Sequence, residues 1–481
     1  MKQRLVTEDN KKWWTLAAVS VGLFVIMLDN TVVNVALPSM QRSLHMTLSE
    51  LEWVVAGYAL TFAAFMLTGG KLADFLGRRL VFMVGLAIFT AASLACGLAP
   101  NGGFLIGARV VQGLGGALMN PATLSIIAAT FPPRQRGTAI GIWAGVSAMA
   151  LAIGPLVGGL LTEHVNWNWI FFINVPIGLL GLLAIPVFVE ESRDTSAEQR
   201  LDLPGLLSSA LGLFSLTYAF IEANTYGWTS GRIVAAFVVA AAALSAFVLF
   251  ERHQRVPMLD LALFRQRTFS GANTAMLFVG LAMFGTFFYV SLYMQKVLDY
   301  SPVQAGASFL PMTVLIIMIA PLAGRLADRF GSRWLVGAGM TLLAVMLFYY
   351  SQLGANASFW VLLPALLIGG AGMSMTMTPT TAAAMSAVPV DQAGVGSAVL
   401  NSARQVGGSL GIAVMGAIVA SGINSSVAAG ASQQSAFLNG FHDALRVSAL
   451  LALAGAVVAT LAIRKVEHRH HRVPEPAAEL V

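Results

Sequence analysis

The chain has 481 residues, of which 57% are hydrophobic and only 10% are charged. Soluble globular domains carry roughly 25% charged residues, so the composition excludes a soluble globule and predicts a polytopic membrane protein. The formal net charge of +6 is explained by basic loops on one side of a membrane, so no nucleic-acid partner is expected. Cys96 is the single cysteine, which excludes an internal disulfide.

Stretches of about 20 apolar residues, the length of a membrane-spanning helix, occur fourteen times along the chain. The predicted spans are 13–36, 51–70, 80–99, 104–128, 138–161, 168–189, 201–222, 231–250, 269–293, 303–324, 334–352, 358–379, 396–421 and 441–463. An even number of spans places both termini on one side. That side carries 22 of the 28 Lys and Arg residues, and the other side carries three. Because basic loops mark the cytoplasm, both termini are predicted to be cytoplasmic.

A charged, glycine-bearing segment occurs twice, as GKLADFLGRR at Gly70–Arg79 and as GRLADRFGSR at Gly324–Arg333. The two copies are 254 residues apart at every matching position. A repeat of this kind in a hydrophobic chain indicates two related halves, which is typical of secondary transporters. The first six and the last six spans then form the halves, and the seventh and eighth are an insertion.

Four units follow from this division. They are an N-terminal six-helix bundle over 1–189, linkers and an inserted transmembrane hairpin over 190–267, a C-terminal six-helix bundle over 268–464 and a cytoplasmic tail over 465–481. The tail is histidine-rich, but we interpret it as a solvated basic segment and predict no metal site. The second hairpin helix, 231–250, has no charge in its middle, so we expect the whole hairpin to lie outside the two bundles and to add packing or a lipid contact and no chemistry.

Four motifs together carry a family resemblance over essentially the whole chain. They are LDNTVVNVALP at Leu28–Pro38, the segment Gly70–Arg79, RVVQGLGG at Arg109–Gly116 and GPLVGG at Gly154–Gly159. With these motifs the chain resembles the fourteen-helix drug–proton antiporter branch of the major facilitator superfamily, the multidrug efflux transporters. The resemblance implies an all-α fold of two pseudo-symmetric six-helix bundles plus a two-helix insertion, with a central cavity and alternating access. It also implies a monomer in the bacterial plasma membrane that exports small molecules against protons and needs no cofactor.

Asp29 lies within a long apolar run, where a carboxylate is costly unless it faces a cavity or a partner. Helix lengths place Asp29 ~12 Å and Arg109 ~9 Å from the outer surface, so the two charges are expected at similar levels. A nearby cation favours the carboxylate and burial favours the protonated acid, which suits a proton-coupling site. The alternative is a polar anchor that holds the first helix to a neighbour.

Two motifs are assigned to conformational change by the resemblance. A cytoplasmic gate comprises Gly70, Lys71, Asp74, Gly77, Arg78, Arg79, Gly324, Asp328, Gly331 and Arg333. The antiporter motif at the interface between the bundles comprises Gly154, Pro155, Gly158 and Gly159. Gly141 with Gly145, and Gly154 with Gly158, are small-xxx-small pairs that are expected to let helices approach closely. The alternatives are a loop that only sets topology and a helix that is only well packed and bent at Pro155.

Polar, aromatic and methionine side chains on several spans are candidates for the substrate cavity, because such surfaces accommodate varied lipophilic ligands. They are Asn34, Tyr58, Gln112, Phe284, Phe288, Tyr289, Met377, Asn401, Arg404 and Gln405. The alternative for each is packing or lipid contact. Glu222, at the end of the seventh span, is interpreted as structural.

Other classes lack their signatures in the sequence. A membrane-embedded enzyme would need a convergent set of metal ligands within the spans, and an ATP-driven pump would need a phosphate-binding loop. Neither is present, so no catalytic residue is predicted. The sequence therefore favours a proton-coupled exporter of lipophilic drugs or other small amphipathic compounds, and the substrate itself is not specified. The alternatives are an exporter of a lipid or an endogenous metabolite, and a uniporter or channel.

Overall fold

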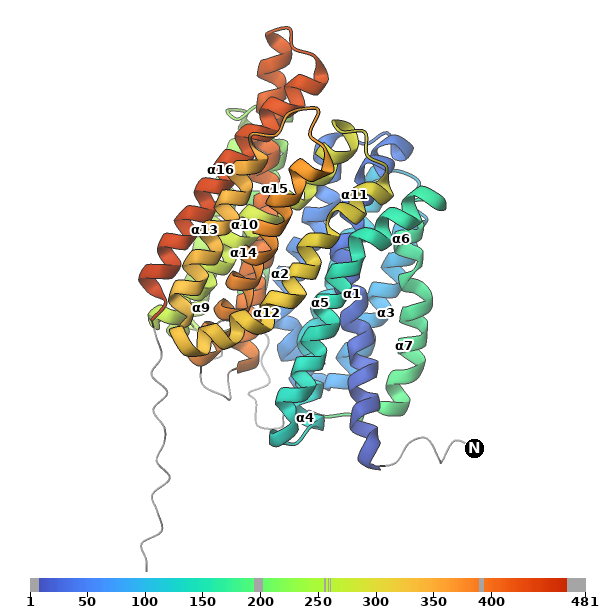
Figure 1. Cartoon of the computed structure of the whole chain (residues 1–481). Coiled ribbons are helices and arrows are strands. Elements are labelled where there is room, and N and C mark those ends of the chain that lie inside the picture. Colours follow the sequence, from blue (N-terminus) through green and yellow to red (C-terminus); the bar gives the residue numbers. More distant parts are fainter. Residues whose placement is uncertain are drawn as a thin grey trace, which may run out of the picture.

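The computed structural model describes residues 8–193, 202–254, 257, 259, 261–388 and 393–464. This part of the chain is helical (Figure 1), and fourteen of its helical segments are long and apolar enough to cross a membrane. The predicted all-α membrane fold and the number of spans are therefore confirmed. The predicted tail, 465–481, and the middle of the linker before the hairpin lie outside the described residues.

The helices follow one another with short connections. In chain order they are α1 (Glu8–Leu44), α2 (Leu48–Leu76), α3 (Arg78–Gly97), α4 (Gly102–Thr130), α5 (Pro133–His164), α6 (Trp169–Phe172), α7 (Asn174–Phe188), α8 (Leu203–Tyr226), α9 (Gly231–His253), α10 (Arg267–Lys296), α11 (Pro302–Ser308), α12 (Leu310–Phe330), α13 (Ser332–Tyr350), α14 (Phe359–Ser386), α15 (Ala393–Ala428) and α16 (Gln433–Ala462), with a short 3₁₀-helix at Leu261–Arg265 before α10.

Two spans that the sequence predicts as continuous are divided into a short and a long helix. The sixth consists of α6 and α7, which meet at Ile173, and the tenth consists of α11 and α12, which meet at Phe309. Pro176 and Pro311 lie just after these breaks. A proline has no N–H to donate to the carbonyl four residues earlier, so each break falls where the helical hydrogen-bond ladder loses a donor.

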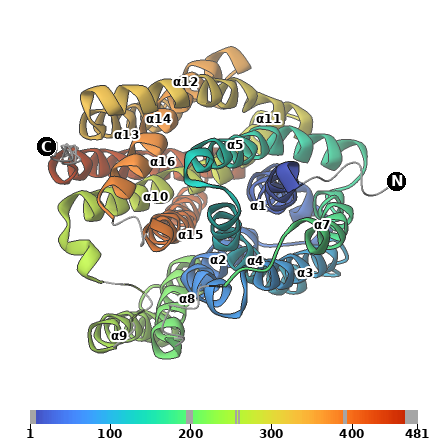
Figure 2. The same cartoon turned by 90° about the horizontal axis from the view of Figure 1, so that it is seen from below.

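The packing repeats with the sequence. In the first group, α1–α7, helix α1 packs against α5 and α7, and α4 packs against α2 and α3. In the second group, α10–α16, the helices about 254 residues later form the same pairs, so α10 packs against α15 and α16, and α14 packs against α12 and α13. The groups meet along α2 with α15 and along α5 with α11, which are again equivalent pairs (Figure 2).

Helix α1 begins and α16 ends at the same end of the molecule, the lower end in Figure 1, which we call the terminal face. The opposite end is the far face. Several hydrogen bonds join the two groups toward the far face. They run from Ser291 Oγ to the Asn34 carbonyl (2.9 Å), from Gln295 Nε2 to the Val35 carbonyl (3.0 Å), from Lys296 Nζ to Gln41 Oε1 (2.5 Å) and from the Val303 N–H to Glu163 Oε2 (2.8 Å).

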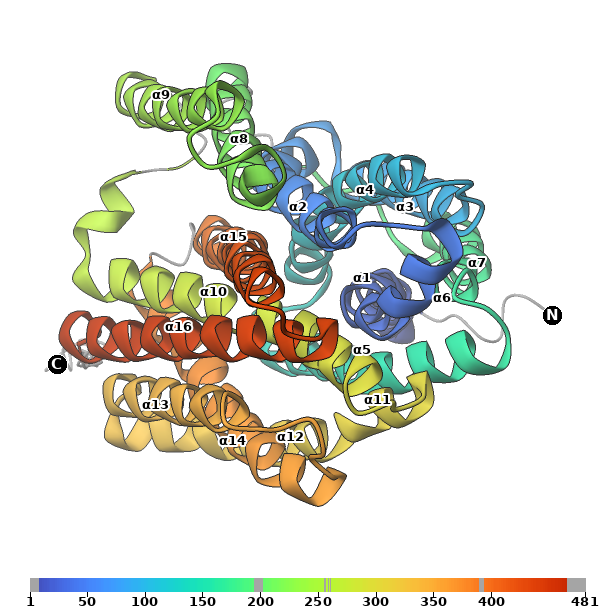
Figure 3. The same cartoon turned by 90° about the horizontal axis from the view of Figure 1, so that it is seen from above.

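Helices α8 and α9 form a pair at the periphery (Figure 3). Helix α9 packs mainly on α8, whereas α8 packs on both α2 and α15 and thus contacts both groups. Trp53 Nε1 donates to Glu222 Oε1 at 3.3 Å, and Asn224 Nδ2 donates to the Ala417 carbonyl at 2.7 Å. The exposed face of α9 is apolar, as a lipid-facing position requires. The bridge that α8 makes across the seam was not predicted.

Candidate functional site

Asp29 lies near the middle of α1, and its side chain is completely buried. The predicted end of this span, at residue 36, was too early, because α1 continues to Leu44, fifteen residues beyond Asp29, which corresponds to ~22 Å of helix. Pro38 is accommodated inside the helix. The carboxylate therefore lies deep within the span, where its charge needs partners.

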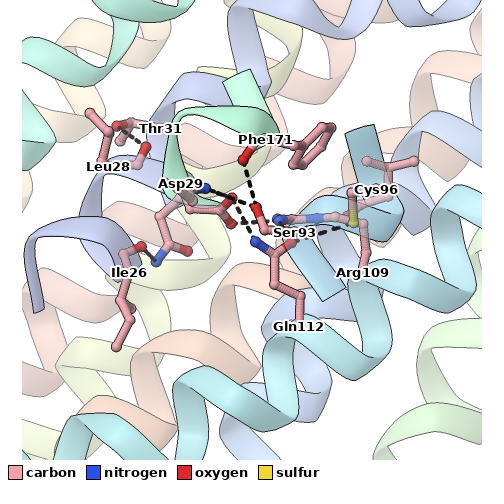
Figure 4. A network of polar contacts seen from close by, with 12 residues as sticks. Ile26, Leu28, Asp29, Thr31, Ser93, Cys96, Arg109, Gln112 and Phe171 are labelled. Atoms are coloured by element: carbon pink, nitrogen blue, oxygen red, sulfur yellow. Dashed lines mark hydrogen bonds and ion pairs between the residues drawn. The ribbon is translucent and has the colours of Figure 1, made fainter. Parts of the chain in front are cut away.

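Arg109 of α4 provides the first of these partners. Its Nη1 lies 2.5 Å from Asp29 Oδ2, and both side chains are buried (Figure 4). Gln112, one turn further along α4, donates from Nε2 to Asp29 Oδ1 at 3.1 Å and accepts from Arg109 Nη1 at 2.7 Å. Residues three apart share one face of a helix, so α4 presents Arg109 and Gln112 together to α1.

Arg109 has further contacts that do not depend on Asp29. Its Nε donates to the Val54 carbonyl of α2 at 3.1 Å. Its guanidinium carbon lies 4.2 Å from the centre of the Tyr58 ring and 5.7 Å from that of Phe171. A guanidinium over an aromatic face is attracted by the negative potential of the ring. The cation is thus held by α2 as well as by α1.

Two polar residues that the sequence did not single out complete the network. Asn174, at the start of α7, donates from Nδ2 to Asp29 Oδ1 at 3.4 Å and to Ser93 Oγ at 3.1 Å. Ser93 donates in turn to the Phe171 carbonyl at 2.9 Å, and the Cys96 thiol lies 3.6 Å from Gln112 Oε1. The available signal was the single polar side chain in the apolar run WIFFINVPIG. The network therefore joins α1, α3, α4 and α7.

The glycines of the Arg109 motif allow α4 to approach its neighbours. A Cβ on Gly113 would lie 2.5 Å from the Tyr58 carbonyl of α2, and one on Gly115 would lie 2.5 Å from the Phe89 backbone nitrogen of α3. Real Cβ atoms do not approach backbone atoms so closely. Close packing on both sides fixes the position of α4, and hence of Arg109, relative to α1.

The antiporter motif lies where α5 meets α1 and α11. A Cβ on Gly158 would lie 2.6 Å from the Val32 carbonyl of α1, and one on Gly159 would lie 2.5 Å from the Pro302 carbonyl. Gly306 of α11 packs directly on the Pro155 carbonyl, and Gly154 packs on Thr31. The motif thus contacts both the helix of Asp29 and the second group.

The prediction that Gly141 and Gly145 form a close-packed pair is wrong. A Cβ on either residue would have no neighbour within 4 Å, and both positions are exposed. The small-xxx-small spacing permits close approach, but within the described part of the chain nothing lies within 4 Å of either position.

Gly158→Ala should impair folding or transport, whereas Gly141→Ala should not. Both substitutions put a methyl group into the same helix, where alanine is favoured over glycine by about 1 kcal/mol. At Gly158 the methyl group would overlap the α1 backbone, and at Gly141 it has free space. Thermal unfolding of both purified variants measures the difference. Equal midpoints would contradict the packing that the structure gives for this motif.

The charged repeat is mostly helical and not a loop, contrary to the sequence-based interpretation. Helix α2 continues to Leu76, so Gly70 is a helical residue that packs near Pro121, and Gly324 lies likewise within α12. The turn consists of Gly77, with φ of +124°, and its counterpart Gly331, with φ of +86°. Residues with a Cβ rarely adopt such values, which explains why glycine occupies both tight helix-to-helix turns.

The charged residues of the first copy connect several segments at the terminal face. Asp74 forms an ion pair with Arg78 (Nη2–Oδ1 2.9 Å), which joins the end of α2 to the start of α3. Lys71 Nζ donates to the Pro257 carbonyl at 2.5 Å. Glu191, which follows α7, accepts from the N–H groups of Arg79 and Leu80 at 3.0 and 3.1 Å. The Asp74–Arg78 pair lies within the first group and does not bridge the two groups.

In the second copy Arg333 is half-buried, and its guanidinium carbon lies 4.9 Å from the centre of the Trp334 ring. The side chain of Asp328 lies outside the described part of the structure. The two copies share the position of their glycine turns, and their side-chain contacts differ.

The predicted cavity residues do not gather at one place. Tyr58 and Gln112 belong to the Asp29 network. Phe288 and Tyr289 of α10 are buried, and Phe284 packs against Gly408 between α10 and α15. Asn34 accepts a hydrogen bond from Ser291 through its backbone carbonyl.

The candidates on α14 and α15 differ in how well their polar atoms are satisfied. Asn401 Nδ2 donates to the Ser397 carbonyl at 3.0 Å, and Met377 is partly buried. Arg404 Nε and Gln405 Oε1 are buried and have no hydrogen-bond partner within the described part of the chain. Unsatisfied polar atoms at such a site are suited to contact with water or a ligand.

The first group contains a second buried carboxylate, which the sequence analysis did not single out. Glu52, near the start of α2, is 2% exposed and accepts a hydrogen bond of 2.6 Å from Tyr289 Oη of α10. It was missed because it lies one residue after the predicted start of the second span, at residue 51, where charges are usually solvated. Within the described residues, no group of three His, Cys, Asp or Glu side chains is arranged to hold a metal ion.

Comparison with known proteins places this geometry in a family. The model of the Major Facilitator Superfamily matches residues 19–412. Similar proteins include the tetracenomycin C resistance and export protein of Streptomyces glaucescens, which is 38% identical over 85% of this chain and 76% of its own length. The multidrug resistance protein Stp of Mycobacterium tuberculosis is 36% identical over 86% of this chain and 77% of its own. The puromycin resistance protein pur8 of Streptomyces alboniger is 38% identical over 85% and 82%.

Solved structures agree in fold. A bacterial homologue of the human lysosomal transporter Spinster superposes with a TM-score of 0.69 and 17% identity, covering 94% of this chain and 97% of the other. The peptide transporter POT gives a TM-score of 0.68 at 14% identity, covering 95% and 99%. The resemblance predicted from the four motifs is confirmed, and the chain belongs to the Major Facilitator Superfamily.

Proposed function

We propose that the protein is a proton-coupled secondary active exporter of lipophilic or amphipathic small molecules that works by alternating access. One observation carries the proposal, namely the ion pair of Asp29 with Arg109 buried deep within the first group of helices. The relatives named for antibiotic resistance and export support an outward direction of transport.

The surroundings of Asp29 suit the exchange of a proton. An isolated carboxylate in the middle of a span costs ~2.5–3.5 kcal/mol on insertion scales, and Arg109, Gln112 and Asn174 offset this cost. When Asp29 takes up a proton, Arg109 loses its counter-ion but keeps Gln112 Oε1, the Val54 carbonyl and the Tyr58 ring. Both protonation states of Asp29 are thus compatible with a folded site.

The contacts of α1 connect this exchange to a movement. The carboxylate of Asp29 ties α1 to α4 and α7, and protonation weakens this tie. On its other sides α1 packs on Gly154 and Gly158 of α5 and binds α10 through the Asn34 and Val35 carbonyls. A change in the contacts of Asp29 with α4 and α7 therefore affects the contact between the two groups. Alternating access must open and close that contact.

We assign the terminal face to the cytoplasm of a bacterial cell, because basic residues concentrate there. The hydrogen bonds that join the groups toward the far face then close the path to the outside. Substrate would enter from the cytoplasmic side in this state.

Transport by purified protein in liposomes tests the proposal. With an imposed pH gradient, puromycin or a lipophilic cationic dye should be moved against its concentration gradient, and dissipating the gradient with a proton carrier should stop it. Transport that ignores the pH gradient would contradict proton coupling. Movement of lipids or endogenous metabolites, with none of the drugs or dyes, would contradict the proposed substrate class.

Asp74→Asn should slow transport without changing stability appreciably. The pair with Arg78 is partly exposed, with 37% and 19% of the two side chains accessible, and such pairs contribute about 0–1 kcal/mol. If the segment acts as a gate at the terminal face, losing the pair should raise the labelling rate of a cysteine introduced at that face. If both the labelling rate and the transport rate are unchanged, the segment does not act as a gate and serves only to set the topology.

A further inference from the structure

We propose that Glu52 is a second proton-binding residue and that it must carry a proton for the two groups to close at the far face. The proposal rests on the transport cycle proposed above, but it concerns a different helix and a different contact. Asp29 lies inside the first group, whereas Glu52 lies on the seam between the groups.

Three helices enclose the Glu52 carboxylate. It belongs to α2, it accepts a hydrogen bond of 2.6 Å from Tyr289 Oη of α10, and it packs so closely on Gly416 of α15 that a Cβ there would overlap it. Its side chain is 2% exposed. Because α10 and α15 belong to the second group, this environment exists only while the groups are together.

Among the described residues, the Glu52 carboxylate has no cationic partner. None of the ion pairs found among the described residues includes Glu52. Arg109, the cation on the α4 side, is bound to Asp29 and to the Val54 carbonyl. From α8 the acidic Glu222 faces this region through Trp53, and from α10 the titratable group is Tyr289. A second acid nearby adds repulsion and no compensation.

A buried carboxylate with no cation is unfavourable as an ion, and a proton removes the charge. When the far face opens, α10 and α15 separate from α2, water reaches Glu52 and the ionised form becomes acceptable. The proton is taken from water at the far face before closure and returns there on opening. Closure is thereby linked to proton uptake on the side from which an exporter receives its protons.

Distance measurement between spin labels tests the proposal without substrate or transport. Labels on Ser43→Cys in α1 and Gln433→Cys in α16, both exposed at the far face, report closure in a Cys96→Ala, Asp29→Asn background, which removes Asp29 as a proton site. As the pH rises from 5 to 9, the population should shift from the short to the long distance. Adding Glu52→Gln should abolish this shift and keep the short distance at both pH values.

Two further variants serve as controls. Tyr289→Phe removes the donor that favours an ionised Glu52, so the shift should remain and move to higher pH. Glu222→Gln should keep the shift. A pH response that survives Glu52→Gln unchanged, or a Tyr289→Phe response at the same pH as the parent, would overturn the role of Glu52 while leaving proton-driven export through Asp29 unaffected.

Discussion

Asp29→Asn should abolish transport driven by a pH gradient and leave the protein folded. Asparagine is close in size and still accepts from Gln112 and Asn174, but it cannot take up or release a proton. The measurement is uptake of a fluorescent substrate into liposomes with an imposed pH gradient, compared with liposomes free of protein. Substrate exchange without a gradient should persist, because the movement itself does not require Asp29 to take up or release a proton.

Asp443→Asn is the matched control. Asp443 is also a carboxylate paired with an arginine, because its Oδ1 lies 3.1 Å from Nη1 of Arg446. Its side chain is 58% exposed, so replacing it should change neither transport nor stability measurably. Gradient-driven transport by Asp29→Asn at the rate of the parent would show that Asp29 is only an anchor for α1.

The sequence identified those residues of the site that are unusual within their own helix. Asp29 and Arg109 are unusual within their own spans, so each could be identified without knowing its neighbour. Helix lengths predicted only that the two charges lie at similar levels, and the predicted end of the first span was too early because α1 extends beyond Pro38. The contact itself exists because α1 and α4 face each other, which spacing along the chain does not establish.

Contacts between helices that are distant in the sequence could not be predicted in this way. Tyr289 was predicted to line a cavity, yet it binds Glu52, 237 residues away in the chain. Gly141 and Gly145 have the same spacing as Gly154 and Gly158, and only the second pair lies against another helix. Local periodicity identifies a face of a helix, whereas the three-dimensional arrangement decides what that face contacts.

The charged repeat shows a related limit. The segment Gly70–Arg79 was interpreted as a gate in a loop between two helices, but Gly70 is helical and the turn is confined to Gly77. Glycine permits positive φ and does not require it. The repeat itself was informative on a larger scale, because helices related by the offset of 254 residues form the same packing pairs in both groups.

Arg109→Gln should destabilise the protein by about 3–5 kcal/mol, the cost of leaving one partner of a buried ion pair without its counter-ion. Thermal unfolding of parent and variant in detergent measures this loss, and equal midpoints would contradict the buried pair that the structure shows.

The double variant Asp29→Asn with Arg109→Gln separates the charge from the packing. With neither charge present, no buried ion lacks a partner, so the double variant should be more stable than Arg109→Gln alone. What remains of the destabilisation then measures the contacts of Arg109 with Tyr58 and the Val54 carbonyl. Two residues in direct contact should give non-additive effects. Strict additivity of the two substitutions would mean that the pair does not act as a unit, and the proton-coupling role assigned to it would have to be abandoned.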